Sequence, residues 1–431
     1  MTKNSVQRTP NPWRVAVVAG WASYIDAAAI VSFGTAIVIY QSALGLTPEE
    51  VGLGAGALTL GIAVGALAGG RLGDRFGRRP VFTVTMVVIV IGALALVFAD
   101  SFPLVVSGAI LLGLGTGADL PVSLSTISEA ANDTNRGKLL GLSNLLWLAG
   151  GIVAGAISVV VGGLGRFGGQ VLFAHIAVVA LVVMIARLSI PESASWAAAR
   201  EERRAGVTAR ADRSSGRALL RKPYLTPFLG LLVFYAFTNL AANTGGQFGT
   251  YLLVNLAGVD VPTAALAAVP ILPLVVIGTL WFMKIADTPR RFTYFTVGAV
   301  LWIIALLIPA VFGFTLITYV ASSVLGVAGA VFSFEGIMKV WTQEQFPTLF
   351  RTTAQGAIIA VARLFAAILA TVTPSIVAVS PNLLYGLLAL FVAIGLGTAW
   401  AVFRTRDSHN EFDEEWLRKP QSAADTSVPL P

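Results

Sequence analysis

Cysteine is absent from this chain of 431 residues, and histidine occurs only twice. The absence of cysteine excludes disulfide bonds, thiolate metal sites and a cysteine nucleophile. The sequence also contains no zinc-type cluster of His and Cys, no Ser–His–Asp set and no phosphate-binding Gly-x4-Gly-Lys loop. We therefore expect neither an enzyme nor an ATP-driven pump, and we expect no metal or cofactor.

Charged residues are also scarce. They make up 12% of the chain, whereas a soluble globular protein carries about a quarter. Hydrophobic residues reach 56%, and the mean hydropathy is +0.80. The net charge is +7, but the basic residues lie in short segments between apolar runs and do not form one binding face, so we expect no nucleic-acid partner.

Long apolar runs are what the sequence has instead. Each is long enough to cross the hydrocarbon core of a bilayer as a helix. We therefore predict an all-α membrane protein with twelve transmembrane helices. The first run is too long for a signal-peptide core and is predicted to be a retained span. The runs lie at 13–36, 50–70, 80–99, 103–128, 138–162, 170–190, 226–255, 262–285, 291–313, 315–343, 352–379 and 382–403.

The basic residues of the connectors occur almost entirely in every second one. Loops rich in Lys and Arg stay on the cytoplasmic side, so we expect both termini in the cytoplasm and a multi-pass protein of the cell membrane. The residues that set this pattern are Arg71, Arg75, Arg78, Arg79, Arg136, Lys138, Lys284, Arg290, Arg291 and Arg351.

The chain divides into two halves around one long polar segment. We expect six-helix bundles at 1–190 and 226–403, a cytoplasmic linker with surface-lying helices at 191–225, and a polar cytoplasmic tail at 404–431. Glu129 and Arg136 recur as Glu344 and Arg351, about 215 residues later. Internal duplication of this kind is how secondary transporters build two bundles around a central site.

Short motifs resemble a known family. The segment Gly-Arg-Leu-Gly-Asp-Arg-Phe-Gly-Arg-Arg, residues 70–79, resembles the signature loop between helices 2 and 3 of the major facilitator superfamily of transporters. Tyr24-Ile25-Asp26 resembles the Gly-Tyr-Asp of its sugar porter branch. Three further segments resemble motifs of the same branch: Glu129-x6-Arg136-Gly137, Pro191-Glu192-Ser193 and Glu344-Gln345-Phe346-Pro347. The resemblance implies a monomer with two pseudo-symmetric six-helix bundles that moves a small solute, with a proton, by alternating access within membrane lipid.

Other residues depart from the sugar porter pattern. Ala109 stands where that branch has an Arg, Lys339 replaces a Trp, and the paired glutamines of its seventh span are missing. Gly117-Ala-Asp119-Leu-Pro resembles an element of phosphate and organic-ion porters, and Arg363 resembles an Arg of the organic-ion branch. These departures leave a second class of solute open.

Two acidic residues in apolar spans are candidates for proton coupling. Asp26 lies roughly 20 Å along the first span, near mid-membrane, where a carboxylate marks a proton or solute path by default. The resemblance gives it the role of protonation site; the alternative is a structural, hydrogen-bonded Asp. With Ala109 in place of the usual Arg, we expect Asp26 to be coupled to Arg363 or Lys339. Asp119 is a candidate second proton site, with a structural role as its alternative.

The remaining candidates would bind solute. One helix face carries Asn239, Asn243 and Gln247. Their amides either bind solute hydroxyls or join neighbouring helices by hydrogen bonds. Gly245-Gly246 is expected to break that helix. Glu335 and Lys339 are spaced as a helical ion pair, which either binds solute or only neutralises itself. Arg363 completes this set. Asn144 resembles a sugar-binding Gln of sugar porters, with Trp147 beside it as a stacking surface.

A last group lies at the expected cytoplasmic ends of the spans. In the family such residues pair across the two bundles while the transporter faces outward, and they separate when it opens inward. This predicted gate consists of Asp74, Arg78, Glu129, Arg136, Glu192, Asp287, Arg291, Glu344 and Arg351.

The function favoured by these residues is proton-coupled symport of a small polyhydroxylated solute, such as a sugar or a cyclic polyol like inositol. The alternative is an organic-anion:proton symporter that uses Arg363 and Lys339. A receptor that does not transport, built on the same fold, is the third reading.

Overall fold

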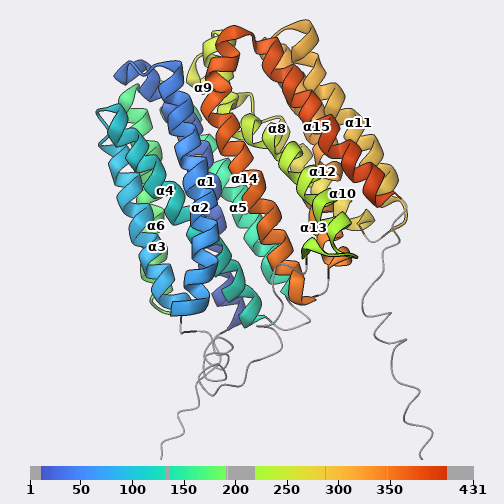
Figure 1. Cartoon of the computed structure of the whole chain (residues 1–431). Helices are drawn as coiled ribbons and strands as arrows, with labels where there is room; N and C mark the ends of the chain where they lie inside the picture. Colours follow the sequence, from blue (N-terminus) through green and yellow to red (C-terminus); the bar gives the residue numbers. More distant parts are fainter. Residues whose placement is uncertain are drawn as a thin grey trace, which may run out of the picture.

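The computed structural model describes residues 11–131, 136–190, 192, 219–286, 288–346 and 348–404. It contains twelve helical segments long and apolar enough to cross a membrane, and no strand occurs in these ranges. The predicted all-α fold with twelve spans is therefore confirmed (Figure 1). The first half contains α1 (Pro12–Leu44), α2 (Pro48–Phe76), α3 (Arg78–Val97), α4 (Phe102–Ala130), α5 (Arg136–Val161) and α6 (Arg166–Arg187).

The second half contains two spans that are each made of two helices. Val261–Ile285 and Leu316–Thr342 are long enough to cross, but the helix is interrupted in each, and Phe334 breaks the second with φ −127° and ψ −114°. The elements are α8 (Leu225–Ala257), α9 (Val261–Leu266), α10 (Ile271–Ile285), α11 (Arg291–Phe312), α12 (Leu316–Ser333), α13 (Glu335–Gln345), α14 (Thr348–Val379) and α15 (Pro381–Phe403).

The expected break at Gly245-Gly246 is wrong, because α8 runs without interruption from Leu225 to Ala257. Glycine lowers helix propensity by about 1 kcal/mol relative to alanine. In a membrane, however, a broken helix leaves backbone groups with no water to bond. Two glycines are therefore not sufficient to end a span.

Local sequence sets the turns between spans. Thr47 and Glu50 form a reciprocal capping box at the start of α2, after Gly45 has ended α1 in the left-handed conformation with φ 68°. Gly77 separates α2 from α3 with φ 101°, which residues with a side chain rarely adopt. The connection around Gly77 defines what we call the arginine-rich end of the molecule.

Small residues let the spans of the first half approach closely. A Cβ atom added to Gly65 or Gly69 of α2 would overlap the backbone of α4 at Leu114 or Ala118. This spacing of small residues is the usual means of helix association in lipid, where apolar burial gives little driving force. It fixes α2 against α4 along the whole arginine-rich half of the span.

The two halves touch through α1 with α8, α2 with α14, and α5 with α9. Their closest approaches include Gly34 with Gln247, Gly52 with Thr371, and Gly162 with Val261. Gly52 lies in the first turns of α2, which begins at the end away from Gly77. These contacts therefore join the halves in the part of the membrane opposite the arginine-rich end.

Candidate functional site

Asp26 lies at the centre of a polar cluster between the halves. Its side chain is 2% exposed, and it accepts a hydrogen bond from Trp147 Nε1 at 3.2 Å. Among the described residues its other oxygen, Oδ1, has no partner. The charges of Arg363 on α14 and Glu335 on α13 both act on this carboxylate. A buried acid of the first half thus lies within electrostatic reach of one cationic and one acidic group of the second half.

A chain of hydrogen bonds crosses from α14 through α8 to α2. Arg363 donates to Asn243 Oδ1 at 3.3 Å, and Asn243 donates to Gln247 Oε1 at 3.2 Å. Gln247 then donates to the carbonyl of Ala55 at 3.0 Å and accepts from Thr59 at 3.1 Å. The amide face predicted on α8 therefore spans the inter-half contact and does not face lipid.

Asn239 is the member of this face with spare bonding capacity. It is 6% exposed, yet its Oδ1 has no hydrogen-bond partner in the part of the chain that the structure describes. A buried amide oxygen without a partner is costly, so such an atom needs an explanation. Tyr235, one turn earlier, stacks on Phe334 with ring centroids 5.3 Å apart, which places the break in span 10 beside this face.

Glu335 and Lys339 form the expected ion pair, with Nζ and Oε1 2.8 Å apart. Their side chains remain 50% and 40% exposed. The pair is therefore accessible, unlike the buried Asp26. Glu335 is the first residue of α13, where the helix N-terminus stabilises an acid.

Trp147 and Asn144 lie on α5, which packs against α1. Trp147 reaches Asp26 through its indole N–H while 46% of its surface stays exposed. Asn144 is exposed one turn earlier on the same helix. Trp147 thus joins the Asp26 cluster by a direct bond.

Asp119 lies outside this cluster, inside the first half. It forms an ion pair with Arg187, and the two side chains are 1% and 3% exposed. Thr85 donates to the same carboxylate at 3.0 Å, and Arg187 also donates to Ser123 at 3.0 Å. The Arg187 guanidinium lies 4.4 Å from the ring centroid of Phe82. This geometry favours the structural alternative for Asp119.

Of the predicted gate residues whose side chains the structure describes, two pairs form within a half, and Glu192 at the start of the linker bonds to the first half. Arg78 donates to Glu129 at 2.7 Å, and Glu192 accepts from the backbone N–H of Arg78 at 2.8 Å. Arg291 forms an ion pair with Glu344, with one of its bonds at 2.8 Å. Asp287 and the side chains of Asp74, Arg136 and Arg351 lie outside the described residues.

Sequence reasoning missed two members of the polar cluster between the halves, Thr59 and Tyr235, and also missed Arg187, the partner of Asp119. Thr59 bonds to Gln247, and its signal was a lone hydroxyl in the apolar second span. Tyr235 continues the four-residue repeat of Asn239, Asn243 and Gln247 by one step towards the N-terminus. Arg187 had only the weak signal of a charge in the last turn of span 6.

Comparisons with known proteins agree with this fold. The family model described as Major Facilitator Superfamily matches residues 16–371. The "Minor myo-inositol transporter IolF" of Bacillus subtilis (strain 168) is 32% identical over 421 residues, covering 94% of each chain.

Two solved structures share the fold at low sequence identity. A D-xylose-proton symporter superposes with a TM-score of 0.76 at 17% identity, over 92% of this chain and 98% of its own. The inward-open xylose transporter XylE from E. coli gives 0.75 at 16%, over 94% and 99%. The resemblance to the major facilitator superfamily, and the expectation of a transporter in place of an enzyme, are confirmed. The chain belongs to the major facilitator superfamily of membrane transporters.

Proposed function

We propose that this chain is a proton-coupled symporter of a small polyhydroxylated solute, a sugar or a cyclic polyol such as inositol, that works by alternating access. The observation that supports this most is that buried Asp26 of one half interacts electrostatically with Arg363 of the other, which donates a hydrogen bond to the amide helix α8. Amides donate to and accept from hydroxyl groups equally well, and the name of the Bacillus relative also points to a polyol.

Asp26 is the proton carrier in this proposal. When Asp26 is charged, Arg363 and Asp26 attract each other across the halves. Protonation removes that attraction and leaves Arg363 to Asn243. The relative energies of the two arrangements of the halves therefore depend on the proton, which is the condition for coupling.

Solute would bind beside this carboxylate. Its hydroxyls would bond to the Asn239 oxygen, which has no partner among the described residues, to the amides of Asn243 and Gln247, and to exposed Asn144. Trp147 would stack on its ring. Glu335 and Lys339 lie at the accessible edge of the site. Asp119 is not required by this proposal, because Arg187 already neutralises it.

The arginine-rich end is proposed to face the cytoplasm, which follows the positive-inside rule. The halves touch at the opposite end, and the gate residues Arg78, Glu129, Arg291 and Glu344 pair within their own halves. Both features support a conformation open to the cytoplasm. Residues 1–190 and 226–403 would be the moving units of a monomer in the cell membrane, with the linker, tail and both termini cytoplasmic.

The replacement of Asp26 by Asn tests the proposal. In vesicles containing the purified variant, we expect loss of uphill uptake of labelled solute with exchange retained, because the amide cannot carry the proton. Asp260→Asn is the matched control, since Asp260 is exposed and caps α9 from just before the first residue of the eighth span. Full accumulation by the Asp26 variant would contradict the assignment.

The second candidate is an organic-anion:proton symporter. It is supported by Arg363 and Lys339, two cationic groups near Asp26 and Glu335. Competition of uptake by polyols against carboxylates at fixed pH separates the two proposals.

A further inference from the structure

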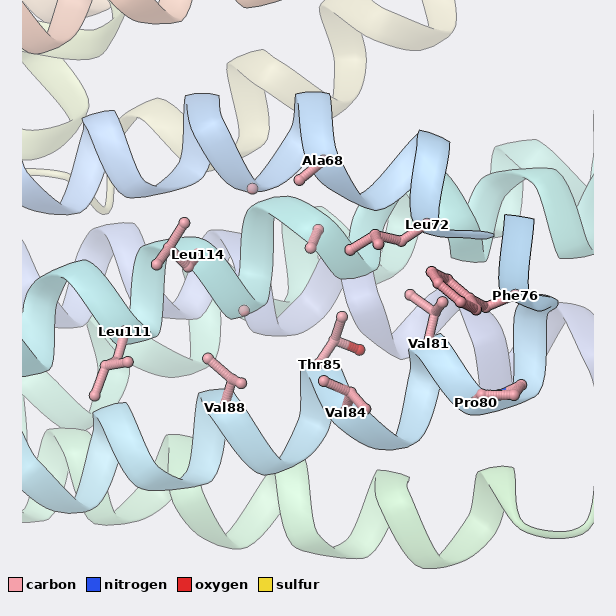
Figure 2. Close-up of a pocket in the computed structure, with 13 residues that line it drawn as sticks. Ala68, Leu72, Phe76, Pro80, Val81, Val84, Thr85, Val88, Leu111 and Leu114 are labelled. Carbon is pink, nitrogen blue, oxygen red and sulfur yellow. The ribbon is translucent and has the colours of Figure 1, made fainter. Parts of the chain in front are cut away.

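A groove runs between α2 and α3 on the surface of the first half, with α4 as its floor (Figure 2). Its volume is about 450 Å³. Both helices pack mainly on α4 and much less on each other, which leaves the space between them open. Thr85 supplies the one polar side chain among the lining residues, and its hydroxyl group is hydrogen bonded to Asp119.

The groove begins at the arginine-rich end and stops near mid-membrane. Its wall on α2 extends from Gly65 to Phe76, a rise of about 16 Å at 1.5 Å per residue. The hydrocarbon core of a bilayer is about 30 Å thick, so the groove has the depth of one leaflet. Phe76 and Val84 are 53% and 61% exposed, which leaves the groove open to the surroundings of the helix bundle. Its length and apolar lining match an extended acyl chain.

Positive charge lies at the mouth of this groove. Arg75 is exposed in the last turn of α2, and its guanidinium lies 5.2 Å from the ring centroid of Phe76, a lining residue. Basic residues at the membrane surface attract anionic lipid head groups. An apolar protein helix docked here would offer no anionic group to bind this positive charge.

We propose that the groove binds one acyl chain of an anionic phospholipid of the adjacent leaflet, with its phosphate against Arg75. The site is separate from the cluster around Asp26 and does not depend on which solute is moved. Through Thr85 it contacts the carboxylate of the Asp119–Arg187 pair, so the bound chain braces α3 against α4 at the arginine-rich end.

Native mass spectrometry of the purified full chain tests this proposal, with equal amounts of dioleoyl phosphatidylglycerol and dioleoyl phosphatidylcholine as probes. We expect the wild type to retain one phosphatidylglycerol in preference to phosphatidylcholine. Val84→Trp fills the groove and is expected to lose this lipid. Val182→Trp is the matched control, because Val182 is 60% exposed on α6, at a similar distance from the arginine-rich end.

The head-group assignment has its own pair of variants. Arg75→Gln is expected to retain a lipid but to lower the preference for phosphatidylglycerol about fivefold, the contribution of one basic residue near an anionic surface. Arg404→Gln should leave the preference unchanged, since Arg404 lies over Trp400 on α15, away from α2.

Several outcomes would overturn the proposal: no preference in the wild type, equal retention by the two Trp variants, or an unchanged preference in Arg75→Gln. If Val84→Trp does not fold, Ala68→Phe fills the same groove from α2, and retention of the lipid by that variant would equally refute it.

Discussion

Two buried carboxylates of the first half differ in what neutralises them. Asp119 is paired with Arg187 of its own half, so the proposed movement of the halves would leave this pair intact. Among the described residues of its own half, Asp26 accepts only an indole hydrogen bond, and the opposing charge of Arg363 belongs to the other half. A carboxylate at this depth is costly without a counter-charge or a proton. In the proposed cycle, movement of the halves would therefore change the proton affinity of Asp26 and leave Asp119 paired.

The Asp119–Arg187 pair gives a stability prediction. Arg187→Gln leaves a buried carboxylate without its counter-charge, which costs about 3–5 kcal/mol. The double variant Asp119→Asn/Arg187→Gln removes both charges and is expected to unfold at a higher temperature than the single variant. Thermal unfolding in one detergent measures both effects. If Arg187→Gln is no less stable than Arg404→Gln, or the double variant is the weaker one, the structural role is refuted.

Replacement of Arg363 by Gln distinguishes a polyol from a carboxylate as the solute. In Arg363→Gln the bond to Asn243 can be replaced by an amide, while the positive charge is lost. A polyol symporter is then expected to keep its affinity for the polyol within about threefold. Removal of a charged partner from a bound carboxylate instead costs about 1.5–3 kcal/mol, which lowers the affinity for a carboxylate about ten- to a hundredfold. Thermal-shift titrations with polyols, hexoses and carboxylates on both proteins measure this. Selective loss of carboxylate binding would contradict the polyol proposal.

At the scale of elements, hydropathy predicts the spans well and their interruptions poorly. All twelve predicted runs correspond to candidate spans, because the energy of insertion sums over some twenty residues. The breaks in the eighth and tenth spans escaped prediction, since a window average does not register a turn such as that at Phe334. Local composition also misled at Gly245-Gly246, where the backbone has no alternative partner in lipid.

Two adjacent glycines of α2 provide an element-scale prediction. A Cβ added at Gly69 would lie 2.6 Å from the Ala118 Cα, whereas one at Gly70 would meet nothing within 4 Å. Gly69→Ala is therefore expected to separate α2 from α4 and to lower the unfolding temperature and the folded yield. Gly70→Ala should behave as wild type or slightly better, because alanine favours helix. Size-exclusion yield and thermal unfolding compare the two, and equal behaviour would refute the close packing.

At the scale of the molecule, the sequence predicted which polar side chains would be enclosed by the helices better than it predicted their partners. The repeated four-residue spacing on α8 and the lone Asp26 identified side chains that lie between the halves. Partners such as Thr59 for Gln247 and Arg187 for Asp119 come from helices distant in sequence. Periodicity describes one helix at a time, so it cannot say which faces meet.

The contact between α2 and α14 is expected to set the balance between the two open states of the proposed alternating-access cycle. A Cβ at Gly52 would overlap the backbone carbonyl of Thr371 across the halves, whereas one at Gly54 would be 3.5 Å from Phe33, an ordinary contact. Gly52→Ala should therefore disfavour closure opposite the arginine-rich end, and Gly54→Ala should not. A shift of about 1.4 kcal/mol changes the ratio of states tenfold.

The chain has no cysteine, so a single cysteine introduced by Asn144→Cys reports access without background labelling. With an impermeant maleimide, we expect labelling from the arginine-rich side in the parent and in Gly54→Ala, and about tenfold slower labelling in Gly52→Ala. Equal rates in all three would mean that this contact does not set the state, and no labelling in the parent would place Asn144 outside the solute path.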